Sequence, residues 1–203
     1  MIKYNIGIDP SLNSTGLCIL TYDDDNIIDK YFAIIKTSKL SKKEKIANEN
    51  YSFFDYYIVD IYNLKDYEED NHLHEVAKTS NFISVLEKIC EVITDYIQSK
   101  EVNINIVQEG ISYGSSLKTR SVFDLAGLNY MLRYKLRQYL KDFTSSTYWI
   151  IPPTEIKKFA TGKGNSKKDV LIEEFKKKFP EFDLPKIDDV VDAYFMASYC
   201  NKL

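Results

Sequence analysis

Three apolar segments alternate with short polar turns near the start of the chain. They cover Ile2 to Ile8, Gly16 to Tyr22 and Ile27 to Ile35, and the run Asp23-Asp24-Asp25-Asn26 separates the last two. Strands joined by such tight turns usually pair with their neighbours along the chain. The pattern therefore predicts a meander of three antiparallel strands, and any fold for this chain must begin with a β-sheet that later segments extend.

Helical and extended segments alternate in the rest of the chain. Apolar residues from Phe82 to Ile97 fall on one helical stripe, for which Ser80 is the expected N-cap. We expect two further strands, over Asn103 to Gln108 and Thr147 to Ile151, and a helix with a leucine stripe over Leu125 to Leu140. Two more helices are expected over Glu155 to Ala160 and over Ile187 to Cys200. A further helix should begin after Ser166, which can cap it with Asp169 in the capping-box position. This order predicts an α/β fold with a mixed sheet, three antiparallel strands and then parallel strands, with helices on both faces.

A length of 203 residues favours a single domain, 1–203. The stretch from Thr37 to Thr79 is the hardest to assign because it is charged and rich in tyrosine. We interpret it as a helical or loop insertion. Its apolar patch, Phe53 to Val59, is a candidate for an extra strand.

Several classes of protein are excluded by simple counts. No apolar run approaches the roughly 18 residues of a membrane-spanning helix, and the first five residues carry no signal-peptide pattern. We therefore expect a soluble, intracellular protein that is not secreted and has no membrane partner. The odd, widely spaced cysteines favour reduced thiols, with Cys18 and Cys90 in the core. The two histidines, His72 and His74, have no third metal ligand nearby, which favours a surface turn over a metal site. We therefore expect carboxylates to carry out any catalysis.

Charge is distributed unevenly along the chain. Residues 21–75 hold 13 Asp and Glu against 7 Lys, whereas residues 115–180 hold 14 Lys and Arg against 6 Asp and Glu. Such asymmetry indicates that one face meets a polyanion, although solvated helices would also explain it.

Acidic residues stand where apolar elements begin or end. Asp9 follows the first strand, Glu109 follows the strand that starts at Asn103, and three aspartates open the last helix. Hard divalent cations prefer such oxygen ligands, and two of them about 3.5–4 Å apart can clamp a phosphoryl displacement. Each position alone has an ordinary explanation: a turn, a salt bridge or a favourable charge at a helix N-terminus. Their occurrence together favours a cation site.

The aspartates of the last helix are not equivalent. Asp189 and Asp192 are three residues apart and share a face, but Asp188 and Asp192, four apart, also share one. Spacing alone leaves both choices open.

The same motifs, in this order, resemble the RuvC family of Holliday-junction resolvases, which have the RNase H-like fold. The opening from Ile6 to Gly16 resembles the family's Gly-Ile-Asp-Pro-Gly motif, and Ile106 to Glu109 its second acidic strand end. Pro152 to Lys158 and Thr161 to Lys168 resemble its lysine-containing helix and Gly-x-Gly loop. Asp189 to Ala193 resembles its closing Asp-x-x-Asp-Ala helix.

The resemblance implies a complete catalytic apparatus. Asp9, Glu109, Asp189 and Asp192 would be the metal-binding catalytic carboxylates, and Lys168 a catalytic lysine. The implied cofactor is Mg²⁺, two ions per active site, with Mn²⁺ able to replace it. The implied enzyme is a homodimer that nicks four-way DNA junctions in pairs. Residues expected to contact DNA are Lys157, Lys168, Lys163, Lys167, Lys118, Arg120 and Tyr113, the last by base stacking.

Two departures and several alternatives accompany this interpretation. Ser11 replaces the motif's glycine, and Gly110 follows Glu109 where bulkier residues are common. The insertion and the ratio of 24 Lys to 3 Arg, typical of an AT-rich genome, are similar to the viral or phage branch, which implies the cytoplasm of a host or infected cell. A flap, branched-DNA or RNA–DNA hybrid nuclease of the same fold remains open. An actin-like ATPase is disfavoured because no Walker spacing occurs, and a non-catalytic DNA-binding module because all four carboxylates are present.

Overall fold

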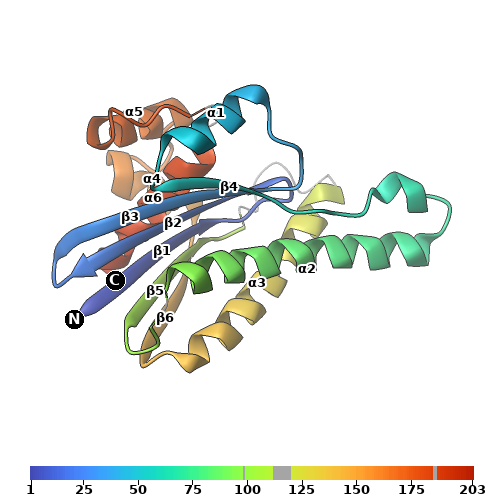
Figure 1. The fold of residues 1–203 in the computed structure, drawn as a ribbon, viewed down its shortest axis with the longest axis horizontal. Coiled ribbons are helices and arrows are strands. Elements are labelled where there is room, and N and C mark those ends of the chain that lie inside the picture. The colour runs from blue at the N-terminus through green and yellow to red at the C-terminus, as the bar shows by residue number, and fades with distance from the viewer. Residues whose placement is uncertain (98, 112–119, 185–186) are drawn as a thin grey trace.

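The protein folds around one six-stranded mixed sheet (Figure 1). The structure is a computed structural model that describes residues 1–97, 99–111, 120–184 and 187–203. The strands are β1 (Ile2–Asp9), β2 (Ser14–Asp23), β3 (Asn26–Lys36), β4 (Phe54–Ile58), β5 (Asn103–Glu109) and β6 (Ser145–Ile151). Their order across the sheet is β4-β3-β2-β1-β5-β6.

The sheet has an antiparallel centre and parallel edges. β1, β2 and β3 form the expected antiparallel meander. β5 pairs in parallel with β1, and β6 in parallel with β5, so these strands end at the same edge of the sheet. β4 adds to the other side, parallel to β3. The predicted mixed α/β sheet is therefore confirmed.

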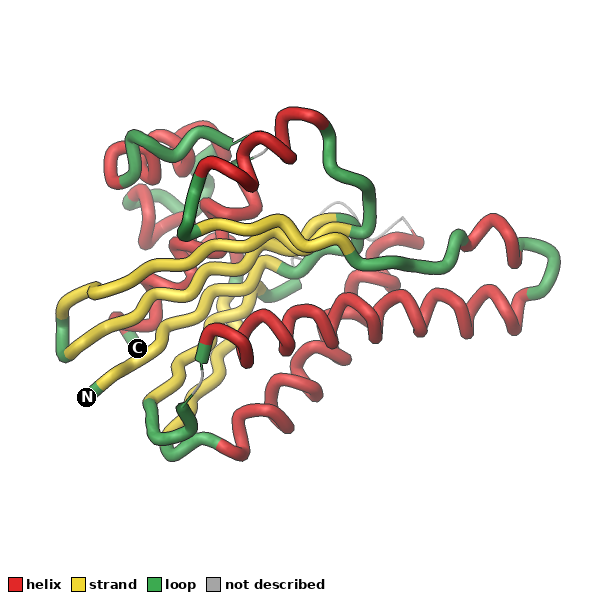
Figure 2. The backbone as a smooth tube through the Cα atoms, viewed as in Figure 1, coloured by secondary structure: helices red, strands yellow, loops and turns green. Residues whose placement is uncertain are grey.

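Helices cover both faces of the sheet (Figure 2). One face carries α1 (Lys42–Asn50), α4 (Pro153–Thr161), α5 (Lys168–Lys178) and α6 (Asp188–Tyr199), and the other carries α2 (Asn71–Tyr96) and α3 (Arg120–Tyr139). Short 3-10 helices span Leu64–Tyr67, Leu140–Asp142 and Cys200–Lys202. No helix in the described part of the chain is long and apolar enough to cross a membrane.

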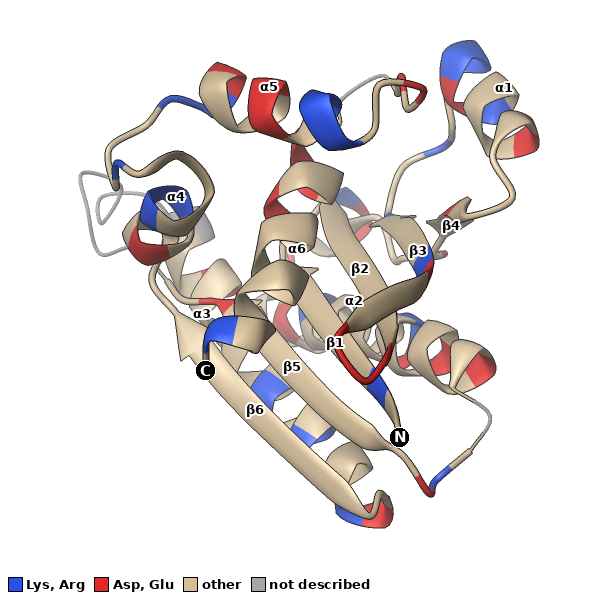
Figure 3. Ribbon diagram, turned by 90° about the vertical axis from the view of Figure 1, so that its left-hand side faces the viewer, with Lys and Arg blue, Asp and Glu red and all other residues tan. Residues whose placement is uncertain are grey.

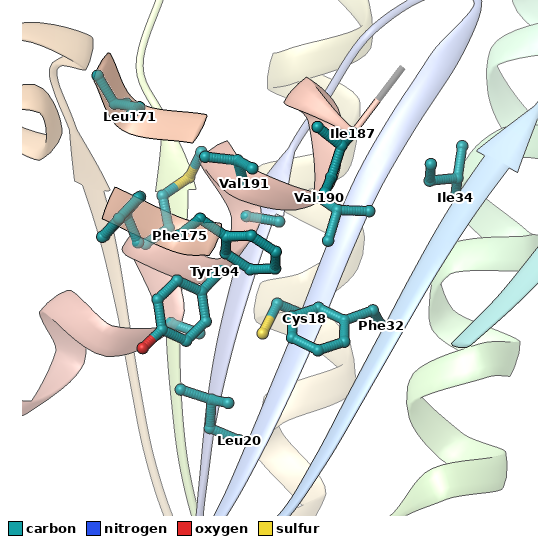
Figure 4. Close-up of a cluster of buried hydrophobic side chains, with 14 of the residues drawn as sticks. Cys18, Leu20, Phe32, Ile34, Leu171, Phe175, Ile187, Val190, Val191 and Tyr194 are labelled. Carbon is teal, nitrogen blue, oxygen red and sulfur yellow. The ribbon is translucent and has the colours of Figure 1, made fainter. Parts of the chain in front are cut away.

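Strand alternation supplies each face with its own core. On the α6 face, Phe32 packs against Phe175, Phe182 and Tyr194 beside buried Cys18 (Figure 4). On the opposite face, the buried isoleucines and leucines of β1 and β2 pack against the apolar stripes of α2 and α3. Because burial on both sides requires a fixed register, the strand ends are held firmly at the edge of the sheet.

Three local predictions are wrong at helix starts. The N-cap of α2 is Asp70, ten residues before the expected Ser80, and its side chain accepts hydrogen bonds from the backbone N–H groups of His72 and Leu73. The two histidines therefore lie on a helix and not in a turn. α5 starts at Lys168 without a side-chain cap, because the Ser166 hydroxyl donates to the Lys163 carbonyl instead.

The remaining local predictions concern the insertion and the thiols. The apolar patch of the insertion does form an extra strand, β4. All three cysteines are free, with Cys18 and Cys200 buried. Cys90 is only partly buried at the rim of the α2 and α3 core, so its prediction as a core residue is wrong. It lies beside the main apolar stripe of α2, where the cover is incomplete.

Candidate active site

Two carboxylates meet because two parallel strands end together. Ile8 of β1 is in register with Gln108 of β5, so the next residues, Asp9 and Glu109, emerge side by side. The two carboxyl groups share a hydrogen bond. The sheet itself thus assembles the first half of the site.

Two glycines let α6 bring the second half. A Cβ on Gly7 of β1 would lie 1.9 Å from the Ala193 carbonyl oxygen, and one on Gly16 of β2 would lie 2.1 Å from that of Asp189. Only residues without a side chain permit so close a contact between strand and helix backbones. The first turn of α6 consequently rests directly on the sheet edge, where Asp189 and Asp192 enter the electrostatic field of Asp9.

Burial and mutual repulsion disfavour the charged forms of these carboxylates. Burial raises the pKa of Asp9 well above its usual range, and the charges of Glu109, Asp192 and Asp189 raise it further. Burial also raises the pKa of Glu109, against the effect of nearby lysines. The pKa of Asp192 is raised to about 6, first by burial and then by Glu109. Such a cluster gains from a cation that neutralises it.

Two lysines supply positive charge beside the carboxylates. The charge of Lys157, on α4, acts on both Glu109 and Asp192. Lys168, the first residue of α5, places its Nζ 3.0 Å from Asp188 Oδ2 and 3.8 Å from Asp192 Oδ2. The site therefore has a basic side, formed by one lysine from α4 and one from α5. Figure 3 shows blue segments on both helices, with red segments from acidic residues beside them.

The two adjacent aspartates of α6 have different partners in the structure. Asp188 pairs with Lys168, on the basic side. Asp189 accepts a hydrogen bond from the Ser14 hydroxyl, at the start of β2, and acts on Asp9. The charge of Asp189 therefore acts on Asp9, whereas the charge of Asp188 acts on Asp192. Ser14 was not singled out in the sequence, where its only signal was its place in the opening motif.

The other expected DNA-contacting residues lie in several places. Lys163 and Lys167 are exposed on the segment between α4 and α5, near Lys168. Arg120 is the first residue of α3, and its side chain lies outside the described part of the structure. Lys118 and Tyr113 lie outside the described residues altogether.

A cavity of about 420 Å³ adjoins the site, and Asp188 and Asp189 line it. Its wall includes a buried ion pair, in which Lys36 Nζ lies 2.5 Å from Glu44 Oε1. No local sequence pattern indicates this pair, because a strand residue and a helix residue form it.

The donor set suits a hard divalent cation, although the side chains are not gathered around one point. Within the described residues, no three His, Cys, Asp or Glu side chains converge closely enough to hold one metal ion. Asp9 is hydrogen-bonded to Glu109, and Asp189 to Ser14. The four carboxylates match the oxygen ligands that Mg²⁺ prefers, and holding an ion requires them to exchange these partners for it.

Comparisons with known proteins find similarity in structure but not in sequence. No protein-family model and no curated protein matches the sequence. The Thermus thermophilus RuvC structure superimposes with a TM-score of 0.52 at 13% sequence identity, covering 100% of this chain and 96% of that one. The fold is RuvC-like.

Two further solved structures are similar to the chain at lower scores. T. thermophilus RuvC in complex with a Holliday junction substrate gives a TM-score of 0.49 at 12% identity, covering 97% of this chain and 90% of that one. The yeast mitochondrial Holliday junction resolvase Ydc2 gives 0.47 at 11% identity, covering 95% and 75%. The RuvC-like fold places Asp9 and Glu109 at the carboxyl ends of adjacent parallel strands, with α6 across them.

Proposed function

We propose that this protein is a divalent-metal-dependent endonuclease that resolves four-way DNA junctions by paired symmetric nicks. One observation carries the proposal. Asp9, Glu109, Asp189 and Asp192 come from three separate elements to one sheet edge, and Lys157 and Lys168 stand beside them. A cluster of partly buried acids facing lysines is costly for folding alone, but it suits hydrolysis of a phosphodiester.

The four carboxylates would hold two Mg²⁺ ions, or Mn²⁺ in their place. When bound, these ions supply an activated water nucleophile and stabilise the leaving 3′-oxygen. Lys157 and Lys168 orient the scissile phosphate and offset the negative charge that accumulates on it in the transition state. Burial of Asp9 and Asp192 keeps bulk water from weakening these charge interactions.

Recognition of the substrate rests on phosphate positions more than on base edges. The basic side of the site continues from Lys157 through Lys163 and Lys167 to Lys168, all lysines of α4, α5 or the segment between them. Lys118 and Arg120 extend the expected basic surface along the chain, and Tyr113 is the proposed stacking residue. Two strands must be cut symmetrically, so the proposed enzyme acts as a homodimer with two sites related by a two-fold axis.

The test uses Mg²⁺ and labelled four-way junctions, flaps, RNA–DNA hybrids and linear duplex. We expect paired symmetric nicks in the junction, lost by at least about a thousandfold in Asp9→Asn while junction binding persists. Asp169→Asn, an exposed acid on α5, is the matched control and should cut normally.

Three other outcomes would change the proposal. Equal cutting of flaps and junctions would widen it to a branched-DNA nuclease. Preference for hybrids would move it to ribonuclease activity of the same fold. Absence of metal-dependent cutting on every substrate would overturn it, and nucleotide binding by calorimetry would then favour the ATPase interpretation.

A further inference from the structure

The ammonium group of Lys168 has two carboxylates within reach, and it is closer to the more exposed one. Its distance to Asp188 Oδ2 is 3.0 Å, a direct hydrogen bond, whereas Asp192 Oδ2 is 3.8 Å away. Asp188 and Asp192 are one helical turn apart on α6, so the lysine lies along the face that carries both. The same lysine therefore interacts with two carboxylates, Asp188 and Asp192.

Exposure distinguishes the two partners. The Asp192 side chain is 16% exposed and the Asp188 side chain is 36% exposed. An ion pair strengthens as its surroundings become less polar, so an unrestrained Lys168 would gain most by closing onto Asp192. Lys168 and Asp192 already form an ion pair, but without a direct hydrogen bond. A direct hydrogen bond would occupy an oxygen that the proposed cation needs, and the closer ammonium charge would repel the cation.

We propose that Asp188 is a positioning residue, which holds Lys168 at 3.8 Å from Asp192, too far for a direct hydrogen bond, and thereby keeps Asp192 available for a divalent cation. Asp188 itself is not a ligand in this scheme, because its carboxylate faces the lysine while Asp189 interacts with Ser14 and Asp9. The inference rests on the proposed cation site. It assigns different roles to two adjacent acids in the first turn of α6: Asp188 positions Lys168, and Asp189 belongs to the proposed cation site.

The test measures Mn²⁺ binding without DNA, by electron paramagnetic resonance of the free ion, in a double-mutant cycle. The four proteins are wild type, Asp188→Asn, Lys168→Met and the double variant. We expect Asp188→Asn to weaken Mn²⁺ binding about three- to tenfold, the range expected for directly contacting side chains. We expect Lys168→Met to tighten binding, because it removes the competing cation. In the Lys168→Met background, Asp188→Asn should change binding by less than about twofold.

The cycle separates positioning from simple charge or ligation. If Asp188→Asn weakens binding equally with and without Lys168, Asp188 acts as a ligand or through its charge, and the inference is overturned. Unchanged binding in Asp188→Asn would overturn it as well. Asp188→Glu, which retains a carboxylate for Lys168, should recover most of the affinity. Asp169→Asn controls for loss of a neighbouring acidic charge, and circular dichroism checks that each variant is folded.

The result also distinguishes failure of this inference from failure of the proposed function. Mn²⁺ binding with no coupling between positions 168 and 188 rejects the positioning role and leaves the nuclease proposal standing. A wild-type protein that binds no Mn²⁺ at all removes the cation site, and the inference falls with it.

Discussion

The two halves of the carboxylate cluster are held in place by different kinds of structure. Asp9 and Glu109 end two parallel strands, and the hydrogen-bonded register of β1 and β5 puts them side by side. Asp189 and Asp192 belong to α6, which has no backbone register with the sheet and depends on packing over Gly7 and Gly16. The strand half should therefore resist substitutions nearby, whereas the helix half should be displaced by small changes in volume or in side-chain contacts.

Gly7→Ala is the strongest way to break the helix half alone. The new Cβ would meet the backbone of Ala193 at 1.9 Å, and backbone atoms cannot swing aside as a side chain can. We expect a loss of more than about 3 kcal/mol in the free energy of unfolding, at the upper end for overpacking. Urea denaturation gives that free energy, and DNA cleavage should be lost in any protein that still folds.

Gly127→Ala is the control for Gly7→Ala. Its Cβ would come no closer than 3.5 Å to Phe82, and it lies inside α3, where alanine is favoured over glycine. We expect equal or slightly higher stability, by up to about 1 kcal/mol. A Gly7→Ala protein as stable and active as Gly127→Ala would mean that α6 can shift without cost, contrary to the proposed dependence on close packing.

The ion pair of Lys36 and Glu44 is a second contact that could hold the helix half in place, because it lines the same cavity as Asp188 and Asp189. Burial tends to raise the pKa of Glu44, but hydrogen bonds from Lys36 and Ser41 outweigh it and leave the pKa below its usual value. The folded state thus binds the Glu44 proton more weakly than the unfolded state does. The stability from the pair is therefore fully present above the unfolded pKa, about 4.3, and is lost as pH falls through the lower folded pKa.

Glu44→Gln isolates this contribution. At pH 7 we expect it to cost about 2–3 kcal/mol in the free energy of unfolding, less than a deeply buried pair because the cavity admits water. The difference from wild type should shrink as pH falls below about 4.3. Urea denaturation between pH 3 and pH 7 would measure it, and a difference independent of pH would mean that Glu44 acts through packing and not through its charge.

The sequence predicted the strand half of the site better than the helix half, for physical reasons. An acid directly after an apolar strand has its position fixed by that strand, so Asp9 and Glu109 could be placed from local pattern. On α6, positions three and four residues apart share a face, and only the contacts with Ser14 and Lys168 separate Asp189 from Asp188. Those contacts join residues that are 20 and 175 positions apart and belong to different elements, so no local pattern records them. The predicted start of α2 was also wrong, because Asp70 caps the helix and Ser80 lies inside it, where its hydroxyl donates to the Val76 carbonyl.

Ser14→Ala is the smallest and sharpest test of the comparison. It removes the hydroxyl that donates to Asp189 and leaves the glycine contacts beneath α6 intact. A hydrogen bond to a charged group is worth about 1.5–3 kcal/mol, so single-turnover cleavage should fall roughly tenfold or more if it orients Asp189 for the reaction. Stability should fall by no more than this hydrogen bond is worth, because water can reach Asp189 in place of the hydroxyl where Ser14 is not fully buried. Ser14→Thr, which keeps the hydroxyl, is the control and should retain most activity. If Ser14→Ala cuts at the wild-type rate, the packing of α6 over the two glycines is enough to orient the helix half. Backbone contacts would then position both halves: strand register for Asp9 and Glu109, and helix packing for Asp189 and Asp192.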